Sequence, residues 1–367
     1  MLLEGLHIPL TTPFHPDGRL NPRKLAANVV RYSKTPTAGL IVLGPSGEST
    51  LLSDDETREV LRTAAEAASP EKVLIAGISR DSVQATLALA EFAAEQNYDV
   101  VLVGVPSFLA LEHQSLPPAP DMDLPRLVKT RFSAQRTFFK TVADRSPLPI
   151  LLLHVHGRII RFPDVVELAS HPNIIGIFGS GWSSEMQQSR ISGLLNRTAG
   201  IRREVAVTAT FAAVTRRMSV GVVASKALVS VASLTGTATA IVELQPAPPQ
   251  IRTRTKVVGF QTIATRTRSM LEALNAGAAG IAPAFAAAAP QASYEVFAAW
   301  KDSDQLLAEE KQIRLIAAAK LAEDCPAALK YACDLNGYFG GLPRLPHLPL
   351  TGEQRSALEA CMKDIRN

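Results

Sequence analysis

Short apolar runs, each nearly continuous in hydrophobicity, recur along the first half of the chain with amphipathic stretches between them. The runs are GLHIPLTTP (5–13), GLIVLG (39–44), VLIAGIS (73–79), DVVLVGVP (99–106), PILLLHVH (149–156) and IIGIFGS (174–180). Strands buried on both faces of a sheet have this composition, and they are parallel when helices cover both faces. The pattern therefore predicts an α/β protein whose parallel strands are joined by right-handed helical crossovers.

Two of the intervening stretches carry clear helix starts. Ser53 followed by Glu56 forms a capping box before TREVLRTAAEAA, and Asp81 precedes SVQATLALAEFAAEQ, with apolar residues at helical spacing. Six such units, with room for two more in 367 residues, favour a (β/α)8 TIM barrel. A doubly wound open sheet is the alternative, but the first strand is not followed by a glycine-rich dinucleotide loop.

Two regions interrupt this alternation. Residues 109–125 (LALEHQSLPPAPDMDLP) are rich in proline, which predicts a loop or lid after the fourth strand. Residues from about 198 to 265 predict an insertion beside the seventh strand. Within it, EVAVTATFAAV (204–214) is expected to form the seventh barrel strand, whereas VGVVASKALVSVASLTGTATAIVEL and TKVVGFQTI are expected to be strand-like additions packed on the barrel.

The last third of the chain returns to the α/β rhythm and then becomes helical. SMLEALNAGAAGIAPAF predicts the eighth unit, a helix followed by a strand at 280–285. Helical patterns then run over 291–323 and 351–365. The expected division of the chain is a barrel over 1–290, which contains the insertion at about 198–265, and a C-terminal helical extension over 291–367.

Cysteine content and the N-terminal segment narrow the class of protein. All three cysteines, Cys325, Cys333 and Cys361, lie near the end of the chain without a CxxC pair, which favours a reducing, cytoplasmic compartment over disulfides or a zinc site. No apolar run reaches the roughly 18 residues of a membrane span, and MLLEGLHIPLTTPF lacks the basic start of a signal peptide. We therefore expect no membrane association, no metal and no cofactor.

The formal net charge of +4 comes from a local excess of basic residues. They are Arg202, Arg203, Arg216, Arg217, Arg252, Arg254, Lys256, Arg266 and Arg268. Such a stripe attracts polyanions, but this one lacks interleaved aromatic residues and any nucleic-acid-binding motif. A solvated basic face is therefore the favoured interpretation, and nucleic-acid binding through the insertion is the least favoured alternative.

Seven segments carry a resemblance to a known family. They are IPLTTPFHPDGRLN, GLIVLGPSGESTLLSDDE, VLIAGIS, PILLLHVHGR, HPNIIGI, ALNAGAAGI and LPLTGEQRSAL. In order and spacing they resemble the dihydrodipicolinate synthase and N-acetylneuraminate lyase family of Schiff-base aldolases. The resemblance implies a (β/α)8 barrel with a C-terminal helical extension and a homo-oligomer, a dimer or tetramer. It also implies condensation or cleavage of 2-keto acids, typically pyruvate, through a lysine imine.

The resemblance also locates the catalytic residues of the family, and this chain differs at three of them. The imine-forming lysine of the sixth strand corresponds to Phe178, the tyrosine of the fifth strand to Leu153, and a second tyrosine after the fourth strand to Phe108. An imine requires a primary amine, and phenylalanine has no nucleophile. We interpret Phe178 as an aromatic side chain that fills the space of the lysine and makes the barrel mouth apolar.

Other positions of the family's site are retained in part. The GPSGE turn keeps Gly44, Gly47 and Glu48, whereas Pro45 and Ser46 stand at the positions of the family's two threonines. The N–H groups of the turn and the Ser46 hydroxyl suit a carboxylate ligand such as a small 2-keto acid. The alternative is a capped turn with Glu48 near the positive end of the following helix. Arg158, in HGR, corresponds to an arginine at the site entrance of the synthase branch; the alternative is an ion pair with a neighbouring acid.

His154 and His156 lie two residues apart and would project to the same face of a strand. Their arrangement suits a metal or acid–base site at the barrel top. The favoured alternative is one packed and one solvated histidine, because the sequence shows no third metal ligand.

Three functional hypotheses follow. The first is a barrel of this family, degenerate at its catalytic site, that lacks pyruvate-type aldolase activity and binds a small anionic ligand. The second is an active 2-keto-acid lyase with a relocated lysine, Lys226 or Lys256 of the insertion. The third is a non-covalent enzyme that uses the two histidines with Glu48 and Ser46.

Overall fold

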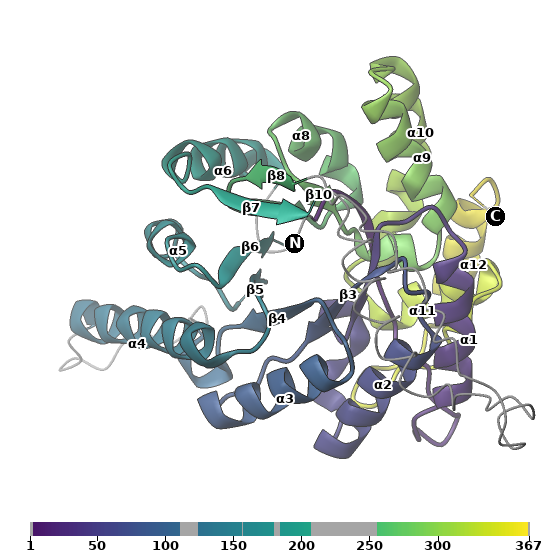
Figure 1. Ribbon diagram of the computed structural model, residues 1–367. Helices are drawn as coiled ribbons and strands as arrows, with labels where there is room; N and C mark the ends of the chain where they lie inside the picture. Colours follow the sequence, from purple (N-terminus) through teal and green to yellow (C-terminus); the bar gives the residue numbers. More distant parts are fainter. Residues whose placement is uncertain (1–2, 111–123, 156, 180–183, 207–254, 366–367) are drawn as a thin grey trace, which may run out of the picture.

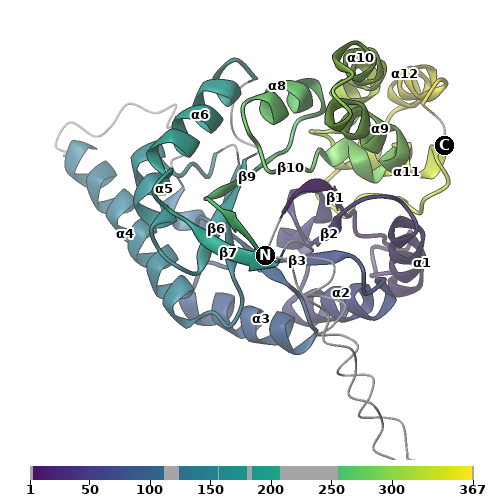
Figure 2. The ribbon, with the colours of Figure 1, turned by 45° about the horizontal axis from the view of Figure 1, so that its top comes forward.

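Eight parallel strands close into a barrel in the computed structural model, which describes residues 3–110, 124–155, 157–179, 184–206 and 255–365. Their order around the barrel is β1-β10-β9-β6-β5-β4-β3-β2, and Figure 2 shows them surrounded by helices, with α1 to α6 along one side and α8 and α9 on the other. The barrel strands are β1 (Gly5–Pro9), β2 (Gly39–Val42), β3 (Val73–Gly77), β4 (Val100–Gly104), β5 (Ile150–His154), β6 (Ile174–Gly179), β9 (Gln261–Ala264) and β10 (Gly280–Ile281). The expected (β/α)8 TIM barrel is confirmed.

Helices connect the strands and continue into the C-terminal region. Those around the barrel are α1 (Pro22–Ser33), α2 (Asp54–Ala67), α3 (Val83–Glu95), α4 (Leu124–Arg145), α5 (Phe162–Ala169), α6 (Ser184–Arg197), α8 (Met270–Asn275) and α9 (Pro290–Lys301). The extension consists of α10 (Gln305–Ala322), α11 (Pro326–Leu335) and α12 (Gly352–Met362). Figure 1 shows α11 and α12 beside α1, and α10 beside α9. The C-terminal helices are therefore present as expected.

The helix starts follow the sequence closely, with one correction. Ser53 and Glu56 form the expected capping box of α2. The cap of α3 is Ser82, which accepts a hydrogen bond from Ala85 N, rather than Asp81. Asp81 instead accepts a hydrogen bond from the backbone N of Ser107 at 2.6 Å, in the turn after β4.

The expectation that residues 204–214 form the seventh barrel strand is wrong. Residues 203–206 form β7 (Arg203–Ala206), which pairs antiparallel with β8 (Thr255–Val258) in a separate two-stranded ribbon. The seventh barrel strand is β9, whose four residues are all buried, as a barrel strand requires. The charged start of β7 suits an exposed ribbon instead. Residues 207–254, including Lys226, lie outside the described residues.

The ribbon is anchored at the end of the barrel where the strands begin. Arg203 Nη2 donates to the carbonyl oxygens of Ala169, His171 and Ile174, at the connection from α5 into β6. Figures 1 and 2 both show β7 near the N-terminus, where β1 starts. Lys256, on β8, is therefore on the side of the barrel opposite to the carboxyl ends of the strands.

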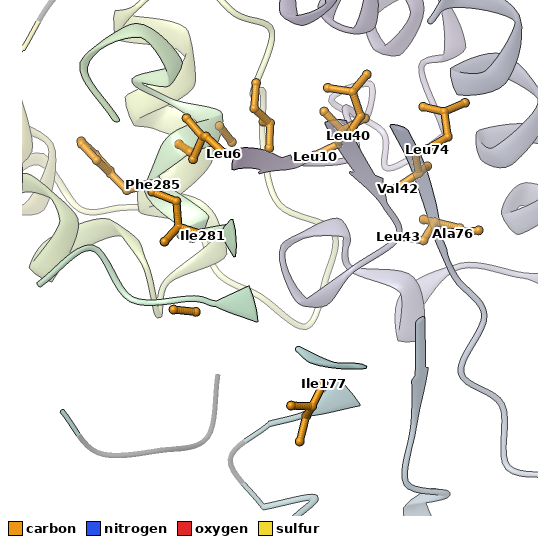
Figure 3. Packing of buried hydrophobic residues seen from close by; sticks show 14 of the residues in the cluster. Leu6, Leu10, Leu40, Val42, Leu43, Leu74, Ala76, Ile177, Ile281 and Phe285 are labelled. Carbon is orange, nitrogen blue, oxygen red and sulfur yellow. The ribbon is translucent and has the colours of Figure 1, made fainter. Parts of the chain in front are cut away.

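Alternate residues of each strand point into the barrel or out toward the helices. The inner cluster consists of Leu3, Ile41, Val73, Ile75, Val100, Leu102, Leu151, Ile175, Phe178, Ile263 and Ala282. The residues between them belong to the larger layer against the helices, part of which Figure 3 shows, including Leu40, Val42 and Leu74. This alternation decides which side chains of a strand can reach a site inside the barrel.

His7 of β1 is an uncommon polar member of the barrel interior. The side chain is fully buried, Nε2 lies 3.2 Å from the carbonyl oxygen of Leu3, and Nδ1 has no hydrogen-bond partner among the described residues. Burial lowers the pKa of His7 from 6.5 to about 4, because the imidazolium would lose its hydration.

We predict that His7→Gln weakens the acid sensitivity of the fold. In the unfolded chain, His7 is protonated below pH ~6.5, whereas in the folded chain it stays neutral down to about pH 4. Stability is therefore lost as pH falls through this window, by about 2 kcal/mol at pH 5 relative to pH 8. Urea unfolding at pH 8 and pH 5 measures the difference. His347→Gln, at an exposed position, is the matched control. An unchanged pH dependence in His7→Gln would contradict the assignment.

Candidate functional site

A cavity of about 280 Å³ opens at the carboxyl ends of the barrel strands. Its walls come from the ends of β1, β5, β6, β9 and β10, from the turn after β2, and from the α10–α11 connection with the start of α11. The lining residues are Pro9, Pro45, Ser46, Val155, Phe178, Thr265, Arg266, Ala282, Ala284, Glu323, Asp324, Pro326 and Leu329. Enzymes with this architecture carry their active sites at this end, so we call this cavity the mouth cavity.

Phe178 forms the apolar floor of the mouth cavity. Its ring belongs to the inner cluster of the barrel and is only 2% exposed. In register, Phe178 pairs with Leu153 of β5 on one side and with Ile263 of β9 on the other. Leu153 packs against the same inner cluster. Two adjacent strands thus place carbon side chains where the family resemblance puts a lysine and a tyrosine.

One wall of the mouth cavity is charged, and sequence reasoning did not assign these residues to a site. Both carboxylate oxygens of Asp324 lie 2.6 Å from Nη1 of Arg266. Next to this pair, Oε1 of Glu323 accepts hydrogen bonds from the backbone N and the hydroxyl of Thr267. Burial raises the pKa of Glu323, whereas the Thr267 hydrogen bonds and Arg266 act in the opposite direction. From the sequence, Arg266 is counted only among the basic residues of the solvated stripe.

The GPSGE turn reaches the mouth cavity through Pro45 and Ser46 alone. Residues 45–47 form a 3₁₀ turn in which Gly47 N donates to the carbonyl oxygen of Gly44, at 2.9 Å. The Gly47 carbonyl accepts from the hydroxyl of Thr12. The Gly47 amide is therefore engaged within the turn, and the Ser46 side chain remains as the polar group of this turn on the cavity.

Glu48 points away from the mouth cavity and forms a buried ion pair with Lys330 of α11. Both side chains are at most 1% exposed. Glu48 Oε2 also accepts from Arg344 N at 2.9 Å, and Lys330 Nζ donates to the Leu342 carbonyl at 3.1 Å. The pKa of Lys330 is lowered, chiefly by burial, although Glu48 acts in the opposite direction. Glu48 is thus a link to the extension rather than a residue at the start of the next helix.

No local pattern in the sequence indicates that Lys330 lies close to the site. It follows Leu329, which lines the mouth cavity, but its ammonium group is enclosed by its partners and stands 4.2 Å from the ring centre of Phe14. Gly340 passes so close to α11 that an added Cβ would lie 1.9 Å from the Lys330 carbonyl oxygen. Among the described residues that line the mouth cavity, none is a lysine.

The structure does not bring His154 into the mouth cavity. His154 has the same parity as the outward-facing Ile150 and Leu152, and it is 2% exposed. Its Nδ1 accepts a hydrogen bond from Ile160 N at 3.3 Å, and burial lowers its pKa to about 4. His156 lies outside the described residues.

Arg158 and Phe108 also lie outside the lining of the mouth cavity. Arg158 follows β5 and is half-buried, and its positive charge contributes to the lowered pKa of Asp81, after the hydrogen bonds from Ser107. Phe108 is 64% exposed and lines a separate groove of about 540 Å³ between α3 and α4.

In the described part of the chain, no three His, Cys, Asp or Glu side chains gather as a metal-binding group. The helices described there include none with the length and apolar character needed to cross a bilayer.

Sequence comparisons agree on one family. The model of the dihydrodipicolinate synthetase family matches residues 2–116 and 222–365, so β5 and β6 lie outside the matched segments. The 4-hydroxy-tetrahydrodipicolinate synthase of Acidiphilium cryptum (strain JF-5) is 25% identical over 99% of both chains. The N-acetylneuraminate lyase of Rhizobium meliloti (strain 1021) is 32% identical over 48% of this chain and 54% of its own.

Solved structures show the same fold. A dihydrodipicolinate synthase from Bacillus anthracis aligns with a TM-score of 0.71 and 20% identity over the full length of both chains. YagE, a prophage protein of the dihydrodipicolinic acid synthase family from E. coli K12, was solved in complex with pyruvate. It aligns with a TM-score of 0.71 and 19% identity, covering 100% of this chain and 99% of its own.

We predict that Lys330→Met destabilises the protein by about 3–5 kcal/mol, because it leaves the buried Glu48 carboxylate without its counter-ion. The double variant with Glu48→Gln is expected to lose less stability than the sum of the single changes. Urea unfolding at neutral pH measures both effects. Lys301→Met breaks an exposed ion pair with Glu4 and is the control, with an expected cost within about 1 kcal/mol. Equal losses in Lys330→Met and Lys301→Met would refute the role of the buried pair.

Proposed function

Because the chain belongs to the dihydrodipicolinate synthetase family and carries Phe178 at the floor of its mouth cavity, we propose that it binds a small carboxylate without forming an imine. The observation that carries this proposal is the placement of the Phe178 ring inside the barrel at the end of β6. Imine formation needs an unprotonated amine that attacks a carbonyl carbon, and the ring has no such group.

The neighbours of Phe178 support a loss of proton transfer as well. Leu153 pairs with it in register and has no titratable group, so it replaces the tyrosine of the resemblance with hydrocarbon. Lys330 is the lysine next to a lining residue, and its ion pair with Glu48 holds the amine away from the mouth cavity. We infer a degenerate catalytic site without pyruvate-type aldolase activity.

The proposed ligand is a small 2-keto acid or a similar carboxylate. The pyruvate in the E. coli structure supports this class, since that barrel aligns over the full chain. A cavity of about 280 Å³ suits a ligand of a few heavy atoms, with its apolar end against Phe178. Ser46 provides a hydroxyl among the lining residues. A homo-oligomer, a dimer or tetramer, and a cytoplasmic location stay predictions.

Two observations weigh against the alternative chemistries. Lys256 belongs to a ribbon anchored at the opposite end of the barrel, so its position does not support a relocated imine lysine there. His154 faces the helix layer, which does not support an acid–base role in the mouth cavity. Lys226 lies outside the described residues, and the following experiment includes it.

We predict that borohydride reduction in the presence of pyruvate leaves the mass of the intact protein unchanged. Phe178→Lys places an amine at the apolar cavity floor, where desolvation favours its neutral form, and is expected to give a reduced pyruvyl adduct. Phe178→Leu is the matched control and should give none. Intact-mass spectrometry reads the result, with circular dichroism to verify that each variant is folded.

A pyruvyl adduct on the unaltered chain would overturn the proposal, and peptide mapping would identify the lysine. Ligand-observed NMR with pyruvate tests the second half of the proposal. Saturation transfer from aromatic protons to the pyruvate methyl group is expected for the unaltered chain and reduced for Phe178→Leu. Absence of any transfer in the unaltered chain at millimolar pyruvate would remove the carboxylate ligand from the proposal.

A further inference from the structure

We propose that Arg266 is the residue that recognises the ligand's carboxylate, and that it does so by exchanging its contact with Asp324 for one with the ligand. This inference rests on the proposed non-covalent binding of a carboxylate in the mouth cavity. Arg266 and Asp324 both line that cavity, and among the described residues that line it the guanidinium is the one cationic group.

The backbone holds Arg266 at the rim of the cavity, next to Phe178. Arg266 follows β9, which pairs with β6 through Gly179, and the hydroxyl of Thr265 donates to the Gly179 carbonyl. On the other side, Thr267 is fixed by two hydrogen bonds to Glu323. The residues on both sides of Arg266 are thus anchored, while its own guanidinium contacts the exposed carboxylate of Asp324.

The contact between Arg266 and Asp324 is of the kind that a ligand can replace. The Asp324 side chain is 76% exposed, whereas that of Arg266 is 25% exposed. An exposed carboxylate is well hydrated, so its pairing with a guanidinium contributes little to stability. A carboxylate that enters the mouth cavity loses water on its apolar side and gains more from the same guanidinium, with bidentate geometry.

The charges of the wall make this exchange necessary for an anionic ligand. Arg266 pairs with the Asp324 carboxylate, so a negatively charged ligand meets the repulsion of that carboxylate unless the guanidinium turns toward the ligand. A neutral molecule of the same size has no such requirement. The structure therefore predicts selectivity for carboxylates over their uncharged amides that depends on Arg266.

The test measures the Kd of pyruvate and of pyruvamide, its uncharged amide, by NMR titration. Arg266→Gln is expected to weaken pyruvate binding by at least about tenfold, since a charge-assisted hydrogen bond is lost. Asp324→Asn is expected to strengthen it by about two- to fivefold, because the competitor for the guanidinium loses its charge. The Kd of pyruvamide should stay within about twofold in both variants.

The opposite signs separate recognition from a structural role of the pair. If the pair only stabilises the α10–α11 connection, both variants weaken both ligands to the same extent, and the inference is overturned. Equal pyruvate affinity in Arg266→Gln and the unaltered chain overturns it as well. The proposed function fails differently: the unaltered chain then binds neither pyruvate nor pyruvamide, or forms a covalent adduct with pyruvate.

Discussion

Closure of the parallel barrel determines what each strand can present to the mouth cavity. Because side chains alternate, an inward-facing residue near the carboxyl end of a strand borders the cavity, and its neighbour faces the helices. Phe178 and Leu153 are inward and paired, whereas His154 is outward. The same alternation that packs the core therefore removes one histidine from the site and sets a phenyl ring at its floor.

The charged groups near the mouth fall into two classes with different energetics. Glu48 and Lys330 are fully buried, and removing either one would leave the other's charge buried without a counter-ion. Arg266 and Asp324 meet at the rim, where solvent already satisfies the carboxylate. The first pair fixes the turn after β2 to the C-terminal extension. The second is weak enough to be rearranged, which is the property that recognition of a ligand requires.

The sequence predicted the strands that are continuously apolar, since burial on both faces leaves a direct mark on composition. It failed at the seventh strand because two apolar candidates, residues 204–214 and β9, lay within one long insertion, and only closure of the barrel selects β9. The Glu48–Lys330 and Arg266–Asp324 contacts join residues far apart in the chain. No local pattern reports such contacts, so the charged wall of the mouth cavity was not foreseen.

The antiparallel ribbon has a consequence for how the long insertion relates to the barrel. The chain leaves through β7 and returns through β8, and these strands are hydrogen-bonded to each other along their length. The two ends of the insertion are therefore held next to each other where they join the barrel. The entropic cost of closing a longer chain between two such fixed ends rises only slowly with its length. The β7–β8 ribbon would therefore allow residues to be inserted or deleted beyond it while β9 keeps its register in the barrel.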